Sequence, residues 1–355
     1  MPVRLARLLV AALIAFGLQG PLQAQQAVQS GLLPAPSTDI DYTTRAGDTM
    51  IGIARRYLND GKLPLVQRAL QEHNALKDAD RINPGQVIRI PENWVRNEAG
   101  RIELVSAQGD VQARGQPALA GATLVSGDEL RTGANSYATV KLADGSTLVL
   151  QPGGSLAIDA VRKSPLAASP EALFTLKGGR VEADVPRRTG GGRFEIRTPV
   201  AVAAVRGTKF RVSSDEQRRS ATSEVLEGAV QVNDTGNLGS VPVPDGFGTR
   251  VLEGSPPATP RALLEAPRLW GGVRLVVRMP ARLNFTVLAG ATNYRLLIAK
   301  NADFTEVLNE SILQSAEIVL SELANGAYFV KVRGIDDLGL EGRDAIADLV
   351  VSVSR

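Results

Sequence analysis

Side chains that commonly carry catalysis or bind metals are scarce in this sequence. The 355 residues include one histidine, His73, and no cysteine. Without cysteine there can be no disulfide, cysteine-ligated zinc or thiolate nucleophile, and a Ser–His–Asp triad or multi-histidine metal site would depend on His73 alone. We therefore expect a protein without enzyme activity, metal or cofactor. The one enzyme class left open is a glycosidase, which would need two carboxylates about 5–9.5 Å apart in a cleft.

Composition also restricts the partners. Lys and Arg number 40 and Asp and Glu 37, giving a formal net charge of +3, and a near-neutral chain has no general electrostatic attraction to nucleic acid. Aromatic residues make up only 4% of the chain, whereas there are 35 glycines and 20 prolines. The core must therefore consist of Val, Leu, Ile and Ala between many turns. At roughly 100–200 residues per domain, we expect a mainly β, multidomain binding protein.

The first residues have the pattern of a secretory signal peptide. Arg4 and Arg7 precede an apolar run over residues 8–18. As a helix this run would rise about 16 Å, far less than the roughly 30 Å hydrocarbon core of a bilayer. The pattern predicts a cleaved signal peptide over residues 1–24, followed by a flexible linker over residues 25–38; the alternative is an uncleaved anchor. We therefore expect a periplasmic protein with no transmembrane segment in the mature chain.

Two short segments combine a turn with polar and small apolar side chains. They are residues 47–50, Gly-Asp-Thr-Met, and residues 81–84, Arg-Ile-Asn-Pro. The flanking patterns predict a strand, two helices and a strand, at residues 41–44, 50–57, 64–73 and 87–90. The two segments would then be loops of a small α+β domain with the order βααβ over residues 39–94.

This segment strongly resembles a LysM domain. The residues that carry the resemblance are Tyr42, Gly47, Asp48, Thr49, Met50, Ile53, Ala54, Tyr57, Asn74, Ile82, Pro84, Gly85, Gln86, Ile90 and Pro91. The resemblance implies binding of peptidoglycan or another N-acetylglucosamine polymer in a groove between the two loops. The glycan-binding residues it implies are Gly47, Asp48, Thr49 and Met50 on one wall, and Arg81, Ile82, Asn83 and Pro84 on the other.

Each of these residues also has a purely structural interpretation. Asp48 or Thr49 could cap the helix that starts there, because a side-chain oxygen can accept from the free N–H groups of the first turn. Met50 and Ile82 could belong to the core. His73 is expected to end the second helix rather than to bind a ligand.

Residues 101–255 show alternating apolar and polar residues between glycine turns. An example is the hairpin at Asp144-Gly145, which follows the alternating residues 138–142. About ten short strands and no helix are expected, in a β-sandwich or rolled sheet. The pair Gly178-Gly179 is predicted to be a turn between two of these strands.

The ordered motifs of this segment resemble a FecR domain. They are Gly109-Asp110-Val111, Gly127-Asp128, Leu130, Thr132-Gly133, Ser136, Leu142, Asp144-Gly145-Ser146, Leu148, Phe194-Glu195-Ile196, Thr198-Pro199, residues 205–210 (Val-Arg-Gly-Thr-Lys-Phe), Glu227-Gly228 and Val230. FecR proteins act on a sigma factor through a cytoplasmic segment, and here a signal peptide and the LysM-like segment stand in its place. The resemblance therefore implies an exported interaction domain, with a membrane sensor or an outer-membrane protein as partner.

Three features of this segment could be functional or structural. Gly207 is expected to have a positive φ or a close backbone neighbour, and Arg206 to pair with a buried carboxylate or carbonyls rather than to bind an anion. Arg187-Arg188 and Arg193 flank three glycines. They are expected to form a solvated hairpin tip rather than a site for an anionic wall polymer.

Prolines at 256, 257 and 260 mark a linker over residues 256–266. Beyond it, residues 267–355 show about seven strands, as in an immunoglobulin-like β-sandwich. Residues 291–299, Phe304 and residues 326–342 resemble a fibronectin type III-like domain, although a tryptophan common near Phe285 is missing. Tyr328 is expected to be a buried strand residue rather than a ligand contact.

Together these patterns predict a non-catalytic, periplasmic, peptidoglycan-binding protein. Its FecR-like and fibronectin-like domains would mediate protein interaction or envelope signalling. The alternative is a structural or adhesive envelope protein without a signalling role. The identity of the protein partner and the glycan preference stay open at this point.

Overall fold

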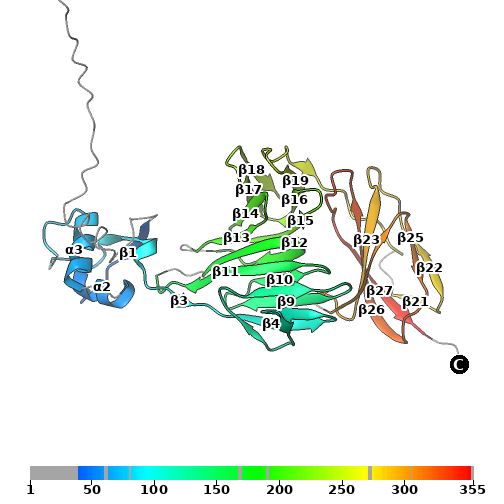
Figure 1. Cartoon of the computed structure of the whole chain (residues 1–355), viewed down its shortest axis with the longest axis horizontal. Helices are drawn as coiled ribbons and strands as arrows, with labels where there is room; N and C mark the ends of the chain where they lie inside the picture. Colours follow the sequence, from blue (N-terminus) through cyan, green and yellow to red (C-terminus); the bar gives the residue numbers. More distant parts are fainter. Residues whose placement is uncertain are drawn as a thin grey trace, which may run out of the picture. The chain divides into compact units, whose positions relative to one another are not determined.

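The computed structural model describes residues 39–352, apart from residues 60–62, 80, 167–169, 189–191, 271–273 and 305 (Figure 1). The chain divides into two compact units, residues 1–96 and residues 97–355. The predicted signal peptide over residues 1–24 and the linker over residues 25–38 lie outside the described residues. In the part of the chain that the structure describes, no helix is long and apolar enough to cross a membrane.

The first unit has the predicted order of strand, helix, helix and strand. The elements are β1 (Asp39–Thr43), α2 (Met50–Tyr57), α3 (Leu63–His73) and β2 (Val87–Pro91), followed by a 3-10 turn at Glu92–Trp94. The two strands pair antiparallel, with Asp39 opposite Pro91. Each helix buries residues spaced three and four apart, which form one face: Met50, Ile53 and Ala54 on α2, and Val66, Ala69 and Leu70 on α3.

The second unit begins with a closed barrel of strands. Its strands are β3 (Glu98–Ala99), β4 (Ile102–Gln108), β5 (Val111–Ala113), β6 (Gln116–Pro117), β7 (Thr123–Leu124), β8 (Glu129–Thr132), β9 (Tyr137–Leu142), β10 (Thr147–Leu150), β11 (Ser155–Lys163), β12 (Glu171–Val185), β13 (Phe194–Arg197), β14 (Ala201–Val205), β15 (Thr208–Asp215), β16 (Ser220–Glu227), β17 (Ala229–Asp234), β18 (Ser240–Pro244), β19 (Phe247–Leu252) and β20 (Arg261–Ala262). The all-β prediction is confirmed, but about ten strands was too few, because several strands are only two or three residues long. β20 lies within the expected proline-rich linker and pairs with β19.

The long strand β12 corrects the prediction of a turn at Gly178-Gly179. Its first half pairs with β11 and β13, and its second half pairs with β10 and β15. The strand bends where it passes from one set of neighbours to the other. Gly179 has a φ of +84°, and a Cβ there would lie 2.6 Å from the Cα of Gly154. A glycine is therefore needed to bend the strand, and the strand continues instead of turning back.

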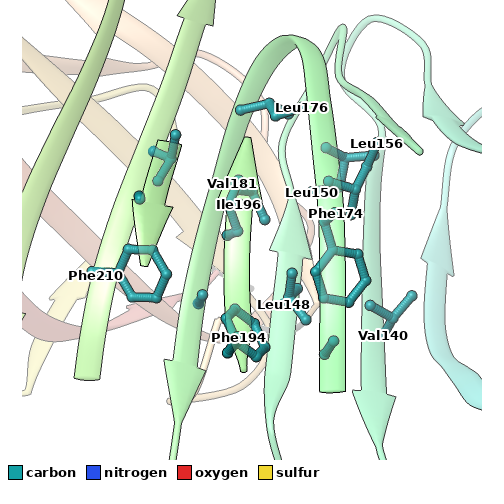
Figure 2. Packing of buried hydrophobic residues seen from close by; sticks show 14 of the residues in the cluster. Val140, Leu148, Leu150, Leu156, Phe174, Leu176, Val181, Phe194, Ile196 and Phe210 are labelled. Atoms are coloured by element: carbon teal, nitrogen blue, oxygen red, sulfur yellow. The ribbon is translucent and has the colours of Figure 1, made fainter. Parts of the chain in front are cut away.

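The barrel interior is filled mainly by Val, Leu, Ile and Ala, as the composition predicts. Three phenylalanines join this core (Figure 2). The ring centroids of Phe174 and Phe194 lie 5.6 Å apart, and those of Phe194 and Phe210 lie 6.4 Å apart in an edge-on arrangement. These spacings are typical of favourable aromatic pairs.

The C-terminal part of the second unit is the predicted immunoglobulin-like sandwich. Its strands are β21 (Leu275–Val277), β22 (Ala281–Asn284), β23 (Asn293–Ala299), β24 (Val307–Leu313), β25 (Glu317–Leu320), β26 (Gly326–Ile335) and β27 (Ala345–Val351). One sheet has the order β21-β27-β26-β23-β24, and the other pairs β22 with β25. Tyr328 is buried, and its hydroxyl donates to the carbonyl of Ala324 at 2.7 Å. This contact is the tyrosine corner typical of immunoglobulin-like sandwiches.

Within the second unit, a buried cluster of charges joins the barrel to the sandwich. The guanidinium of Arg333 on β26 is fully buried, and it lies 3.4 Å from the Glu182 carboxylate on β12. Arg211 on β15 reaches Asp344, which precedes β27, at 2.8 Å. Buried charges are tolerated only when they are paired, so these ion pairs hold the barrel and the sandwich together as one unit.

Candidate glycan-binding site

The two loops of the proposed groove meet at Thr44, at the end of β1. The Thr44 amide donates to the carbonyl of Gln86 at 2.9 Å, and its hydroxyl donates to the carbonyl of Asn83 at 2.6 Å. The Gly85 amide returns a hydrogen bond to the Thr44 carbonyl at 2.9 Å. The Gln86 side chain accepts from the Asn83 amide at 3.1 Å. These bonds tie the start of the first loop to the end of the second loop.

Asp48 braces the first loop. Its carboxylate accepts from the Arg45 amide and from the Tyr42 hydroxyl, each at 2.7 Å, and lies 3.6 Å from the Arg56 guanidinium. The Arg45 amide, followed by the Tyr42 hydroxyl, holds the pKa of Asp48 below its ordinary value, and the charge of Arg56 adds to this. These partners occupy the Asp48 carboxylate. A sugar would therefore have to contact exposed atoms of the neighbouring residues in this loop. Gly47, with a φ of +86°, forms the turn that precedes it.

Thr49 rather than Asp48 caps α2. The Thr49 hydroxyl accepts from the Gly52 amide at 3.1 Å, as an N-cap side chain does. Met50 is 0% exposed and packs in the core. An acetyl methyl group could not reach it in this conformation, so Met50 supports the first wall from beneath.

The second wall offers more exposed surface. Arg81, Asn83 and Pro84 are exposed and Ile82 is half-buried. Arg81 lies 3.4 Å from the Asp78 carboxylate. The apolar contact that an N-acetyl group needs would therefore come from Ile82 and Pro84, and the polar contacts from Asn83 and the backbone.

Sequence reasoning missed some residues at these loops. Thr44 ties the loops together, and its position at a strand end next to a turn was the available signal. Ile51 and Val87, exposed at 36% and 52%, follow the two loops directly in the chain. Exposed apolar side chains at such positions extend the surface on which a sugar could pack.

His73 ends α3, as expected, and has a structural role. Its Nε2 lies 2.8 Å from the Asp39 carboxylate, and its ring centroid lies 5.6 Å from that of Trp94. The next residue, Asn74, exchanges two hydrogen bonds with the backbone of Arg89, at 2.8 and 2.7 Å. These contacts fix the end of α3 to both strands. Among the described residues, no group of three or more His, Asp or Glu side chains could hold a metal ion.

The candidate features of the barrel differ in their outcome. Gly207 has a φ of +99°, and a Cβ there would lie 2.5 Å from the Cα of Arg187. This matches the expected positive φ and close backbone neighbour. Arg206 is exposed, and no carboxylate in the described part of the chain lies within ion-pair distance of it. The expected buried partner of Arg206 was therefore wrong.

Arg188 also differs from the expected solvated hairpin tip, part of which falls outside the described residues. Its guanidinium is buried, lies 2.6 Å from the Asp144 carboxylate and sits 5.1 Å from the centroid of the Phe194 ring. Burial lowers its pKa, and the charge of Asp144 opposes that shift. The neighbouring Arg193 pairs with Glu195. Arg188 therefore anchors this segment to the barrel, because a paired arginine can be buried where a free one cannot.

Comparison with known proteins identifies two of the three modules. The LysM domain model matches residues 42–91, and the FecR protein model matches residues 128–231. No curated protein is significantly similar to the chain in sequence. LysM domains bind N-acetylglucosamine polymers and FecR domains belong to envelope signalling proteins, so both are binding or signalling families rather than catalytic ones.

Solved structures show distant likeness. A structure from Parabacteroides distasonis assigned as an anti-sigma factor is 19% identical over 38% of this chain, with a TM-score of 0.32, and the match spans 59% of that protein's length. A second structure of the same description is 20% identical over 38% of this chain and 59% of that one, with a TM-score of 0.31. An Fn3-like protein from Clostridium thermocellum is 17% identical over 26% of this chain and 96% of that protein, with a TM-score of 0.20.

The three domains follow one another along the chain. The first unit has the βααβ fold and is matched by the LysM model, and the barrel is matched by the FecR model. The last seven strands form two sheets with a tyrosine corner. The chain therefore carries a LysM domain, then a FecR domain, then an immunoglobulin-like sandwich.

Proposed function

We propose that this protein is a non-catalytic, periplasmic protein that binds peptidoglycan through its LysM domain. The joining of the two loops at Thr44 supports this proposal most strongly, because it ties the end of the first strand to the loop that precedes the second strand. Exposed backbone and side-chain polar groups beside Ile82 and Pro84 suit the amide, hydroxyl and acetyl groups of N-acetylglucosamine.

The FecR domain and the sandwich would present a surface to a protein partner, with a membrane sensor or an outer-membrane protein as the class we favour. Their role in this proposal is protein interaction or envelope signalling. The rival role is structural or adhesive. Deletion of the gene distinguishes the two roles. Loss of a signalling protein changes transcript levels, whereas loss of a structural protein produces an envelope defect alone.

Glycan binding is tested by sedimentation with purified peptidoglycan. The Ile82→Asp substitution puts a charge on a half-buried loop residue, and we expect it to abolish co-sedimentation of the full chain while circular dichroism stays unchanged. The matched control is Val287→Asp, which adds the same charge at a side chain that is 78% exposed in the sandwich. Retained sedimentation of the Ile82→Asp variant would reject the groove. Absence of binding by the unchanged protein would reject the wall-binding function.

A further inference from the structure

A polar cleft of about 510 Å³ lies in the second unit, between the FecR domain and the sandwich. Its floor comes from four neighbouring strands of the barrel. Arg180 on β12 is directly opposite Ser213 on β15, Ser213 is opposite Thr222 on β16, and Thr222 is opposite Arg250 on β19. The floor therefore includes a cross-strand row with a cation at each end and hydroxyl groups between them. Asp215, Arg218 and Ser220 lie beside this row.

Alternation along the strands points this row away from the barrel core. The residues next to the row, Val181, Val212, Ala221 and Val251, belong to that core. Since successive side chains of a strand point to opposite faces, the row faces outward. Neighbouring strands are about 4.8 Å apart, so the strands of Arg180 and Arg250 are separated by three such spacings. The two long side chains can both reach a ligand that lies on the hydroxyl groups.

The sandwich supplies the opposite wall, which includes Thr292, Asn293 and the turn over residues 335–339. The Asp336 carboxylate of this turn is already occupied, because it accepts from the amides of Leu338 and Leu340, each at 2.9 Å. Arg261 pairs with Asp336 at 3.3 Å and also with the neighbouring Asp337. The single charge of Arg261, which lies outside the cleft, is therefore shared by the two acids of this wall.

The arginines of the cleft differ in their partners. Arg180 pairs with Glu341, and Arg218 pairs with Asp215 at 3.4 Å. For Arg250, no carboxylate among the described residues lies within 4.0 Å, and its Nε is buried without a hydrogen-bond partner there. Among the described residues, its only hydrogen bond to another side chain is a long one, 3.4 Å, to the Ser220 hydroxyl. Arg250 is thus a cation in the cleft that has no counter-charge.

Burial lowers the pKa of Arg180 to about 10, and the charges of Arg333 and Arg211 add to this effect, whereas Glu224 opposes it. Because Arg180 already pairs with Glu341, Arg250 is the cation of the cleft that would take the charge of a bound anion.

We propose that this cleft binds a small ligand that carries both an oxyanion and hydroxyl groups, of the class of acidic sugars. The guanidinium of Arg250 would pair with the oxyanion through two parallel N–H groups, as arginine commonly does with carboxylate and phosphate. The Ser213 hydroxyl is bonded to Thr222 at 2.7 Å, and the Thr222 hydroxyl donates to Glu224 at 2.8 Å. These two oxygens would therefore accept from sugar hydroxyls, and the Asn293 side chain would add a further contact. The cleft volume is within the range of small-molecule sites, and such sites are common at domain junctions. This site is independent of the LysM groove.

The proposal is tested by calorimetric titration of the full chain at low ionic strength. The probes are N-acetylmuramic acid, which has a carboxylate, N-acetylglucosamine 6-phosphate, which has a phosphate, and neutral N-acetylglucosamine. We expect at least one acidic probe to bind at least tenfold more tightly than the neutral sugar, and the affinity to fall as salt is added. The two acidic probes show whether the site takes a carboxylate or a phosphate.

Variants assign the binding to the cleft. Arg250→Gln should weaken binding of the acidic sugar at least tenfold, and Asn293→Ala, on the opposite wall, should weaken it severalfold. Arg282→Gln is the matched control, because Arg282 is exposed on the sandwich and pairs with Glu317 at 3.1 Å; its affinity should equal that of the unchanged protein. If the LysM variant Ile82→Asp weakens binding of the acidic sugar, the binding lies in the LysM groove and not in the cleft.

Three further results would overturn the proposal: equal affinity of Arg250→Gln and the unchanged protein, equal binding of acidic and neutral sugars, or no binding of either acidic probe at millimolar concentration. Circular dichroism and the melting temperature show whether Arg250→Gln is folded. If that variant does not fold, Asn293→Ala decides, because its side chain lies on the other wall of the cleft.

Discussion

The guanidinium of Arg333 in the sandwich lies 3.4 Å from the Glu182 carboxylate in the FecR domain, although 151 positions separate them in the chain. Arg333 is 0% exposed and also lies 3.1 Å from Glu341 and 3.4 Å from Asp344. Removing one member of a buried ionic cluster leaves the opposite charges without compensation. This relationship therefore makes the stability of the second unit depend on contacts between its two domains.

Arg333→Met should destabilise the second unit by about 3–5 kcal/mol, since it leaves buried carboxylates unpaired. The measurement is the free energy of urea unfolding of the full chain, followed by a probe of the second unit. The control Arg282→Met removes an exposed arginine that pairs with Glu317, and exposed pairs contribute only about 0–1 kcal/mol. Equal unfolding midpoints for the two variants would show that the cluster contributes nothing to the joint.

Gly207→Val should destabilise the FecR domain by about 1–3 kcal/mol or more, because it adds backbone strain and a clash. The clash is with the Arg187 backbone, 2.5 Å from an added Cβ. Gly121→Val separates the two causes, since Gly121 has a φ of +90° but no atom within 4 Å of an added Cβ. Thermal or urea unfolding should give a larger loss for Gly207→Val than for Gly121→Val. The reverse order would mean that close packing at Gly207 is unimportant.

Acid should destabilise the FecR domain partly through Glu129. Hydrogen bonds from Arg131, Ser155 and Lys177 lower the pKa of this carboxyl to about 2. The pKa in the unfolded chain is about 4.3, so the native state favours the charged form. The resulting stability is present above the unfolded pKa and is lost as the pH falls from about 4.3 to about 2.

Glu129→Gln should therefore flatten the fall in unfolding free energy over that pH range. The expected difference is about 1–2 kcal/mol, reduced from the full linkage value because the side chain is partly in solvent. Unfolding in urea at several pH values measures it. Asp159→Asn is a suitable control, because Asp159 is exposed on the same domain and accepts from Thr175 at 2.7 Å. Parallel pH profiles for Glu129→Gln and the unchanged protein would contradict the assignment.

Thr44→Val should loosen the LysM loops while preserving side-chain shape. The substitution removes the hydroxyl that donates to the Asn83 carbonyl at 2.6 Å in a buried position, which should cost about 1–3 kcal/mol. We expect weaker sedimentation with peptidoglycan and a lower melting temperature of the first unit. Thr43→Val is the neighbouring control, because Thr43 is exposed on β1. Unchanged sedimentation of the Thr44→Val variant would indicate that binding does not require the two loops to be tied.

Cleavage of the predicted signal peptide would give the mature protein a defined N-terminus. The mature protein should begin near Gln25 and should appear in the periplasmic fraction. Mass spectrometry of the purified protein measures this directly. Detection of residues 1–20 on the mature protein would favour the uncleaved anchor instead.

Much of the fold could be predicted because the local patterns are strong. The spacing of Met50, Ile53 and Ala54 predicted α2, and the alternation of Tyr328, Val330 and Val332 predicted β26. The alternation of apolar and polar residues shows which residues of a strand share a face. It does not show what packs against each face. For this reason the burial of Lys331 and Arg333 against the FecR domain could not be predicted.

The two loops of the candidate site were predictable, but the packing of their side chains was not. Turn residues marked both loops, whereas the exposure of Met50 and Ile82 depends on packing between segments distant in the chain. Similarly, Gly178-Gly179 has the composition of a turn, and only the neighbours of β12 make it a bend within one strand. The counter-charge of Arg188 lies 44 positions away at Asp144, beyond the range of any local pattern.

The register of β1 with β2 has a mechanical consequence. Asp39 is opposite Pro91 at one end of the strand pair, whereas Thr43 and Val87 adjoin the loops at the other end. If glycan holds the loops and the rest of the chain pulls, the load first meets the bridge between Val95 and Leu58 and the bond from the Arg96 amide to the Tyr57 carbonyl. Beyond these contacts it runs along β2 from end to end. The hydrogen bonds to β1 lie across that load, so they resist it together in shear instead of opening one after another. Resistance to forced unfolding is governed by the unfolding rate, and the LysM domain would thus hold a wall attachment under tension longer than its equilibrium stability suggests.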